Sequence, residues 1–172
     1  MDLTPYIREI PDFPQKGVLF RDITTLLRDR EAFRYTVDAF CKRYRDAGID
    51  VIVGIESRGF IFASAIAYVL GRSFVPVRKE GKLPHTTLKQ EYALEYGSNA
   101  VEIHRDAVSK GQNVLVVDDL VATGGTLLAT IKLIEMLGGD VVECATLIEL
   151  RALRGRERLD QYSLFSLLQF DT

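Results

Sequence analysis

The strongest constraint on the fold is the segment from Val114 to Thr126, where a short apolar run meets an acidic pair and then a glycine-rich turn. The run Val114–Val117 is apolar at every position, as in a central parallel strand that is covered on both faces. A helical pattern begins at about Thr126 and continues to Leu137. Because strand, loop and helix in this order form half of a βαβ crossover, the segment predicts an α/β fold.

The same alternation of strand and helix recurs along the chain. Helices are predicted over residues 29–47 and 60–70, and strands over residues 51–55, 74–77 and 141–147. Pro76, which has no N–H to donate, indicates an end or an irregularity in its strand. We therefore expect one open, mostly parallel sheet flanked by helices. The loops after Ile55, Val77 and Val117 should meet at its carboxyl edge, where such sheets bind ligands.

Length and composition are those of a single domain over residues 1–172. A chain of 172 residues can bury roughly two thirds of its unfolded surface. With 22 Lys and Arg against 24 Asp and Glu, interspersed, no basic stripe favours a nucleic-acid partner. No apolar stretch approaches the roughly 20 residues of a membrane span, and residues 1–10 lack the features of a signal peptide. We expect a cytoplasmic protein in which Cys41 and Cys144 are reduced and structural.

The loop after Val117 has the composition of an anion site. Gly124 and Gly125 permit a tight turn, and Thr123 and Thr126 add hydroxyl donors to the free N–H groups of the helix start. The loop lacks the lysine of a Walker motif, and the chain contains no G-x-G-x-x-G fingerprint. ATPase and dehydrogenase functions are therefore not favoured.

The acidic pair Asp118 and Asp119 limits the classes of ligand that this loop could bind. Two carboxylates would repel the phosphates of a nucleotide, but they can accept hydrogen bonds from vicinal sugar hydroxyls or hold a divalent cation. The unit as a whole fits a phosphorylated ribose. The simpler alternative is a structural turn in which Asp119 caps the helix.

Cations gather in the two other loops. Arg58, beside Gly59, offers a forked cation at a helix start, although a surface arginine beside a helix cap is the plainer interpretation. Arg78, Lys79 and Lys82 place three cations in five residues, which is also the pattern of a solvated charge run. Their place at the same sheet edge favours a second, highly charged anion. By contrast, neither His85 nor His104 has a second His or Cys at ligand spacing, so neither is assigned a role.

The sequence VLVVDDLVATGGT, residues 114–126, resembles the phosphoribosyl-pyrophosphate signature of the type I phosphoribosyltransferases. The resemblance implies that Asp118 and Asp119 bind the ribose and that the 5′-phosphate is bound by Ala122, Thr123, Gly124, Gly125 and Thr126. It implies a pyrophosphate site made of Ser57, Arg58, Arg78, Lys79 and Lys82, with a cis peptide between Glu56 and Ser57. Mg²⁺ would be carried by the pyrophosphate, near Asp118 and Asp119, and no dedicated protein ligand is assigned to it.

Further motifs resemble the branch of this family that acts on adenine, over essentially the whole chain. They are PDFP, GVLFRDIT, RKEGKLP, LEYG and FSLLQF. The resemblance implies a base-recognition hood over residues 1–28, a flexible catalytic arm over residues 78–97 and a homodimer. It implies that Leu19, Phe20 and Arg21 bind adenine, although residues 18–21 alone could be an apolar strand entering the core.

The resemblance also implies the chemistry. Glu95, Tyr96 and Arg58 would be the catalytic residues in transfer of 5-phosphoribosyl from its pyrophosphate to N9 of adenine. From the residues alone, Glu95 and Tyr96 could equally be a charged strand edge and a packing aromatic. Specificity for xanthine or orotate is the alternative within enzymes, because a phosphate loop does not distinguish bases. A regulator that senses phosphoribosyl pyrophosphate is the alternative outside them, but no added DNA-binding helices are present.

Overall fold

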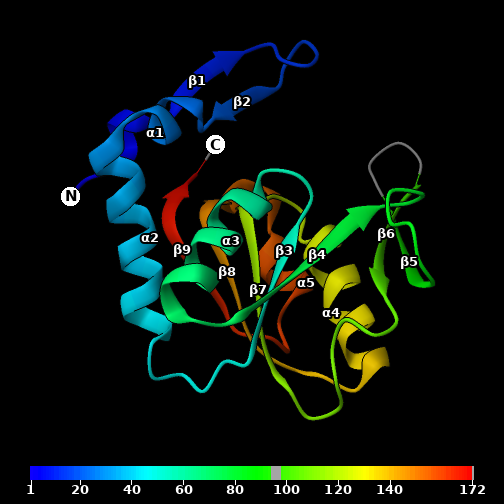
Figure 1. Cartoon of the computed structure of the whole chain (residues 1–172). Coiled ribbons are helices and arrows are strands. Elements are labelled where there is room, and N and C mark those ends of the chain that lie inside the picture. The colour runs from blue at the N-terminus through cyan, green and yellow to red at the C-terminus, as the bar shows by residue number, and fades with distance from the viewer. Residues whose placement is uncertain (94–97, 172) are drawn as a thin grey trace.

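A computed structural model, which describes residues 1–93 and 98–171, has a seven-stranded sheet flanked by helices (Figure 1). The strands are β3 (Val51–Ile55), β4 (Ser73–Lys79), β5 (Thr87–Ala93), β6 (Ser98–His104), β7 (Asn113–Val121), β8 (Asp140–Leu150) and β9 (Leu164–Phe170). Their order in the sheet is β5-β6-β4-β3-β7-β8-β9. The five from β4 to β9 run parallel, whereas β6 pairs antiparallel with both β4 and β5. The expected open, mostly parallel sheet is confirmed.

Helices cover both faces of the sheet. The long ones are α2 (Arg30–Tyr44), α3 (Gly59–Leu70) and α4 (Gly125–Leu137); the short ones are α1 (Thr24–Arg28), α5 (Gly155–Arg158) and the 3₁₀ turns at Thr4–Tyr6 and Arg151–Leu153. Leu115 and Val117 of β7 pack into the cluster with α2 and α3, whereas Val114 and Val116 pack into the cluster with α4. Both faces of β7 are thus buried, which explains its lack of alternation.

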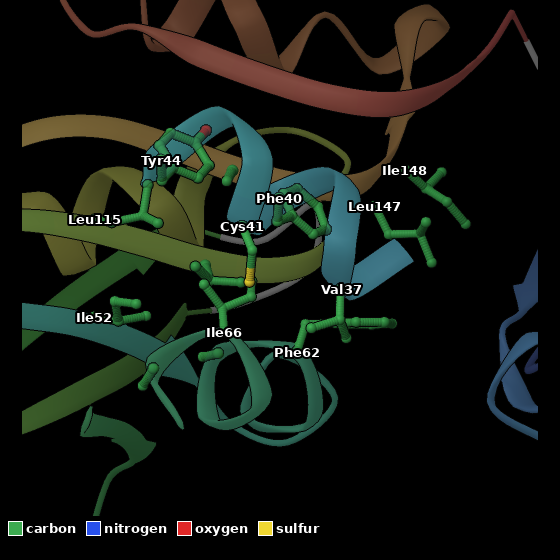
Figure 2. Close-up of a cluster of buried hydrophobic side chains, with 14 of the residues drawn as sticks. Val37, Phe40, Cys41, Tyr44, Ile52, Phe62, Ile66, Leu115, Leu147 and Ile148 are labelled. Carbon is green, nitrogen blue, oxygen red and sulfur yellow. The ribbon is translucent and has the colours of Figure 1, made fainter. Parts of the chain in front are cut away.

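The cluster between the sheet and α2 and α3 is built from interlocking aliphatic and aromatic side chains. Figure 2 shows Phe40 and Cys41 of α2 facing Phe62 and Ile66 of α3, with Leu115 of the sheet beside them. Phe40, Phe62 and Ile66 are fully buried. This packing fixes α3, and therefore the loop that precedes it, against the sheet.

Several element boundaries differ from those expected. The predicted helix over residues 29–47 begins at Arg30, because the Asp29 carboxylate accepts hydrogen bonds from the N–H groups of Glu31 and Ala32, and it ends at Tyr44. The central strand β7 continues to Val121 instead of ending at Val117. Asp118 and Asp119 are therefore strand residues, held by ladder hydrogen bonds, and not loop residues.

Pro76 lies inside β4 without interrupting it. The Val77 carbonyl accepts a hydrogen bond from the Glu56 N–H at 2.9 Å, so Val77 faces β3. Successive residues of a strand direct their backbone groups to opposite flanks, so Pro76 faces the other flank. There β6 pairs only at Arg78 and Lys79, and a missing N–H leaves no ladder bond unmade.

Three strands of the sheet were not predicted as strands, namely β5, β6 and β9. The predicted arm, residues 78–97, contains β5, which pairs with β6 from Thr87 to Ala93. The predicted hood contains a separate antiparallel pair of strands, β1 (Arg8–Pro11) and β2 (Leu19–Asp22), followed by α1. Figure 1 shows this hairpin above the main sheet, on the side where β9 ends.

The two cysteines are free and buried, as expected. Burial raises the pKa of the Cys41 thiol and raises that of Cys144 to about 12. Both side chains are therefore protonated packing groups. In the part of the chain that the structure describes, no helix is long and apolar enough to cross a bilayer.

Candidate functional site

The loop from β7 to α4 encloses a cavity of about 90 Å³ at the carboxyl edge of the sheet. Its lining is contributed by Asp118, Leu120, Val121, Ala122, Thr123, Gly124, Gly125, Thr126 and Leu127. Gly124 is left-handed, with φ of 77°, and no side chain caps the first N–H groups of α4. Free N–H groups and the positive end of the helix dipole therefore face the cavity, which suits a phosphate. All five residues predicted for the 5′-phosphate line this one cavity.

Gly155, at the start of α5, supports this loop from behind. A Cβ at Gly155 would lie 2.3 Å from the Ala122 carbonyl oxygen and 3.0 Å from the Gly124 nitrogen. Only a glycine permits this approach. Gly155 was not predicted as a site residue, because no motif or periodicity connects it with a loop so far away along the chain.

The two acids of β7 lie beside the cavity, where burial and their proximity to each other disfavour the charged forms. The Asp118 Oδ1 accepts a hydrogen bond from the Asp119 N–H at 2.9 Å. Burial raises the pKa of Asp118 well above its ordinary value, and the neighbouring charge of Asp119 raises it further. Burial also raises the pKa of Asp119, against the opposing effect of Arg58. Sugar hydroxyls or a cation that approached this pair would relieve the cost of burying the charges.

Arg58 connects the acids with the hood. Its Nε lies 3.0 Å from Oδ2 of Asp119, which is 5% exposed and has no hydrogen-bond partner within residues 1–93 and 98–171. The contact is thus an ion pair without good hydrogen-bond geometry. The guanidinium carbon also lies 5.2 Å from the ring centroid of Phe20. The peptide bond between Glu56 and Ser57, just before Arg58, is cis, as the resemblance implied.

Glu56 holds the loops after β3 and β4 together. Its carboxylate accepts hydrogen bonds from Arg78 Nε at 3.1 Å, from Arg78 Nη2 at 3.3 Å and from the Lys79 N–H at 3.0 Å. Burial would raise the pKa of Glu56, but these donors outweigh it and lower the pKa. Arg78 also donates to the Lys82 carbonyl at 3.0 Å, while Lys79 and Lys82 are exposed. The predicted cations therefore share one edge, whereas Glu56, the carboxylate that organises them, was not predicted as a site residue.

The hood presents the predicted base-binding residues on β2. The Phe20 ring packs edge-on against Phe13 at 5.1 Å and faces Arg58. Arg21 is 3% exposed; its guanidinium contacts the Glu9 carboxylate and lies 4.1 Å from the ring centroid of Phe170 in β9. Leu19 is half-buried and pairs with Pro11. Phe20 thus contacts the same arginine as Asp119 does, whereas the Arg21 side chain is directed elsewhere.

Two predicted catalytic residues, Glu95 and Tyr96, lie outside the described residues. Across residues 1–93 and 98–171, no cluster of three or more His, Cys, Asp or Glu side chains could hold a metal ion alone. The described site therefore contains the phosphate loop, the acid pair, Arg58 with the nearby cations, and Phe20.

Comparison with known proteins agrees with this geometry. Residues 24–172 match the phosphoribosyl transferase domain family. The adenine phosphoribosyltransferase of Clostridium novyi is 54% identical over 171 residues, which cover 99% of each chain. The crystal structure of adenine phosphoribosyltransferase from Thermoanaerobacter pseudethanolicus superimposes with a TM-score of 0.95 at 52% identity, covering 98% of each chain.

A third similar protein was solved with ligands. The Saccharomyces cerevisiae adenine phosphoribosyltransferase, complexed with adenine and an imino-altritol bisphosphate, has a TM-score of 0.92 at 41% identity over 96% of each chain. The α/β fold and the phosphate loop define a phosphoribosyltransferase, and the chain belongs to that family. Within it, the full-length relatives place the chain among the adenine phosphoribosyltransferases.

Proposed function

We propose that the protein transfers the 5-phosphoribosyl group from 5-phosphoribosyl 1-pyrophosphate to N9 of adenine, forming AMP and pyrophosphate. The observation that carries this proposal is the position of Arg58, which contacts Asp119 on one side and Phe20 on the other. A ribose bound at the acids and a base stacked at the phenylalanine would therefore be neighbours. Full-length similarity to proteins named adenine phosphoribosyltransferase supports the same reaction.

The phosphate loop orients the sugar. Its N–H groups and the hydroxyls of Thr123 and Thr126 would hold the 5′-phosphate, while Asp118 and Asp119 accept hydrogen bonds from the ribose hydroxyls. Bond breaking at the anomeric carbon places positive charge on the ribose. Two carboxylates beside it stabilise that charge, and fixing both reactants lowers the entropic barrier.

The cationic loops would receive the leaving group. Arg58, Arg78, Lys79 and Lys82, together with Ser57, would bind pyrophosphate as its negative charge develops. Arg78 and Arg58 each contact a carboxylate, so pyrophosphate would have to share or replace those partners. The exposed Lys79 and Lys82 need no such exchange.

The donor set fits Mg²⁺ carried by the substrate. Asp118 and Asp119 are adjacent carboxylates, and the buried Oδ2 of Asp119 lacks a directed hydrogen bond from the described residues. Mg²⁺ typically takes one or two carboxylates and completes its shell with substrate oxygens and water. When bound, the ion would neutralise charge on the pyrophosphate, and Asp118 and Asp119 would hold it.

Adenine would bind between the hood and the sheet. The Phe20 ring would stack on the purine, and backbone groups of Leu19 and Arg21 would read the 6-amino group and a ring nitrogen. A 6-oxo purine presents an acceptor where adenine has donors, so it would leave these groups unpaired. Glu95, with Tyr96 beside it, would manage the proton of the base during transfer.

An assay of base specificity tests the reaction. The protein is mixed with phosphoribosyl pyrophosphate and Mg²⁺, and adenine, hypoxanthine, xanthine and orotate are offered separately. We expect AMP from adenine and little nucleotide from the other bases. Product from another base but not from adenine would overturn the specificity, and no product from any base would favour the regulator.

The role of Glu95 has its own test. Glu95→Gln should lower kcat more than it weakens binding of phosphoribosyl pyrophosphate, because the change removes a proton acceptor and keeps the shape. Unchanged turnover would remove Glu95 from the mechanism.

We also propose a cytoplasmic homodimer. Exposed apolar side chains, namely Ile61, Tyr68 and Val69 of α3 and Phe74 of β4, offer a surface for a second copy. Arg78 would lie near that interface. Sedimentation should give a dimer, and a fully active monomer would contradict it.

The proposed location in the cytoplasm is supported by the two cysteines. The reduced, buried thiols of Cys41 and Cys144 are typical of a reducing compartment, and fractionation of cells tests that location.

A further inference from the structure

The hairpin of the hood forms a sheet of its own. Among the described strands, β1 and β2 pair only with each other, and three of the four residues of β1 are exposed. An isolated two-stranded hairpin is marginally stable in water. The position of the hairpin therefore depends on the side chains that it buries.

Arg21 is the most informative of these side chains. An arginine that is 3% exposed is unusual and needs compensation for its lost hydration. One partner, the Glu9 carboxylate, belongs to the same hairpin. Another, the Phe170 ring, belongs to β9 of the main sheet and lies 4.1 Å from the guanidinium carbon. The attraction between a cation and an aromatic face is strongest where water is excluded, as it is here.

Neighbouring side chains of β2 have opposite directions. Because side chains alternate along a strand, Phe20 points toward Arg58 and the site, whereas Arg21 points toward Phe170. A rotation or shift of Arg21 would move the Phe20 ring and the backbone beside it. Figure 1 shows β9 ending directly below the hairpin, where this contact can act.

We propose that Phe170 is a positioning residue for base binding, which acts through Arg21 and never touches the substrates. The inference rests on the proposed function, since it assigns adenine recognition to β2. Loss of the ring should weaken binding of adenine and leave binding of phosphoribosyl pyrophosphate unchanged, because Phe170 contacts Arg21 of β2 and is not among the residues that line the phosphate cavity.

The chain contains a matched control on the same strand. Phe165 of β9 also carries an arginine over its ring, with the Arg43 guanidinium 4.2 Å from the centroid. Its other ring contact is Phe40 of α2, in the core. Phe165→Leu therefore removes an interaction of the same type and distance, but far from the hood.

The experiment compares steady-state kinetics of Phe170→Leu, Phe170→Tyr and Phe165→Leu with the original protein. Phe170→Leu should raise KM for adenine about 3- to 10-fold, with KM for phosphoribosyl pyrophosphate changed less than about twofold, in keeping with the loss of one shielded cation–π contact. Phe170→Tyr keeps an aromatic face and should restore the adenine KM. Phe165→Leu should lower Tm and leave both KM values unchanged.

Three results would overturn the inference. They are an unchanged adenine KM in Phe170→Leu, an equal rise in both KM values, or the same selective rise in Phe165→Leu. If Phe170→Leu does not fold, Arg21→Lys is the second variant, because it replaces the planar guanidinium that stacks on the ring by a compact ammonium group. Arg21→Lys should raise the adenine KM, and an unchanged KM would also overturn the inference. An original protein that makes no AMP would instead remove the proposed function, and this inference with it.

Discussion

The phosphate loop and the hood contribute to the site in contrasting ways. The loop follows the central strand β7, whose two flanks are paired and whose faces are buried, and it offers mainly backbone groups. The hood carries a two-stranded sheet that is separate from the main one, and this hairpin offers a half-buried aromatic ring and a strand edge. Substitutions cannot replace the backbone groups that form the phosphate loop, and they can only distort it. The side chains of a hairpin can be replaced one at a time without distorting the rest of the site.

This contrast has a chemical counterpart. Every phosphoribosyl donor has the same 5′-phosphate, so a rigid backbone cradle suits it. The bases differ in their edges, so recognition on a separate hairpin allows one fold to serve different bases. Substitutions in the phosphate loop should therefore be tolerated less well than substitutions in the hood.

The largest effect is expected in the phosphate loop. Gly155→Ala would place a methyl group 2.3 Å from the Ala122 carbonyl oxygen, and the loop must move to admit it. We expect a loss of about 2–3 kcal/mol in the free energy of unfolding. KM for phosphoribosyl pyrophosphate should rise at least about 10-fold, the change that 1.4 kcal/mol of lost binding produces. Denaturant titration and initial-rate kinetics measure the two quantities.

Gly71→Ala is the control for that substitution. Gly71 closes α3 with φ of 63°, and a Cβ there would meet no atom within 4 Å. The control should lower stability by about 1 kcal/mol through backbone strain alone. If it also raises KM for phosphoribosyl pyrophosphate, the effect at Gly155 is not specific to the loop.

A moderate effect is expected at the base side of the hood. Phe20→Leu removes the stacking face but keeps an apolar side chain, so we expect KM for adenine to rise about 5- to 10-fold, the lower range for stacking on a base. KM for phosphoribosyl pyrophosphate should not change. Phe13→Leu, which alters only the ring packed edge-on against Phe20, should have a smaller effect on adenine. Equal effects of the two changes would argue against stacking.

A smaller effect is expected at the clamp that Glu56 forms with Arg78 and the Lys79 N–H, between the loops after β3 and β4. Because the pKa of Glu56 is lowered, its carboxylate stabilises the fold above its ordinary pKa of 4.5, and this stability is lost as the pH falls through the lowered value. Glu56→Gln should cost about 1 kcal/mol at neutral pH, as expected for a partly buried pair, and almost nothing in strong acid.

Denaturant titration across this pH range would check the clamp. Glu80→Gln is a suitable control, because the Glu80–Lys89 pair is exposed on both sides. A pH-independent cost at Glu56 would show that hydrogen-bond geometry, and not charge, is responsible.

The smallest effect is expected on the outer surface of the hood. The nearest Arg8 and Asp22 atoms are 3.7 Å apart, and the Arg8 side chain is 55% exposed. The pKa of Asp22 is lowered first by the Thr24 N–H and only weakly by Arg8. Arg8→Met should change stability by less than about 0.5 kcal/mol, with both KM values unaffected. A larger shift in the adenine KM would show that surface pairs also position the hairpin.

The phosphate loop could be predicted from sequence because its determinants are contiguous. Four apolar residues, two acids and the glycine turn specify strand, acid pair and cradle within one short segment. The acids nevertheless lie on the strand, because pairing with β8 continues to Val121. Gly155 could not be found, since its role depends on tertiary contact with Ala122.

The arm and the hood were harder to predict, for identifiable reasons. Leu88 and Tyr92 pack toward α4 on one side of β5, but polar residues between them hid the alternation. β9 shows no period of two, and its membership in the sheet depends on pairing with β8. The pairs Arg58–Asp119 and Arg21–Phe170 join distant segments, so composition and spacing could not show them.

The buried cysteines have a practical consequence. Because both native thiols stay protonated inside the core, maleimide reagents should leave the folded protein unlabelled. A single cysteine introduced at an exposed position, such as Lys16 of the hood or Lys89 of β5, would then be the dominant reactive group. Labels on both positions, as a pair of fluorophores or spin labels, could report how the hood and the arm approach each other during turnover, with no native cysteine removed.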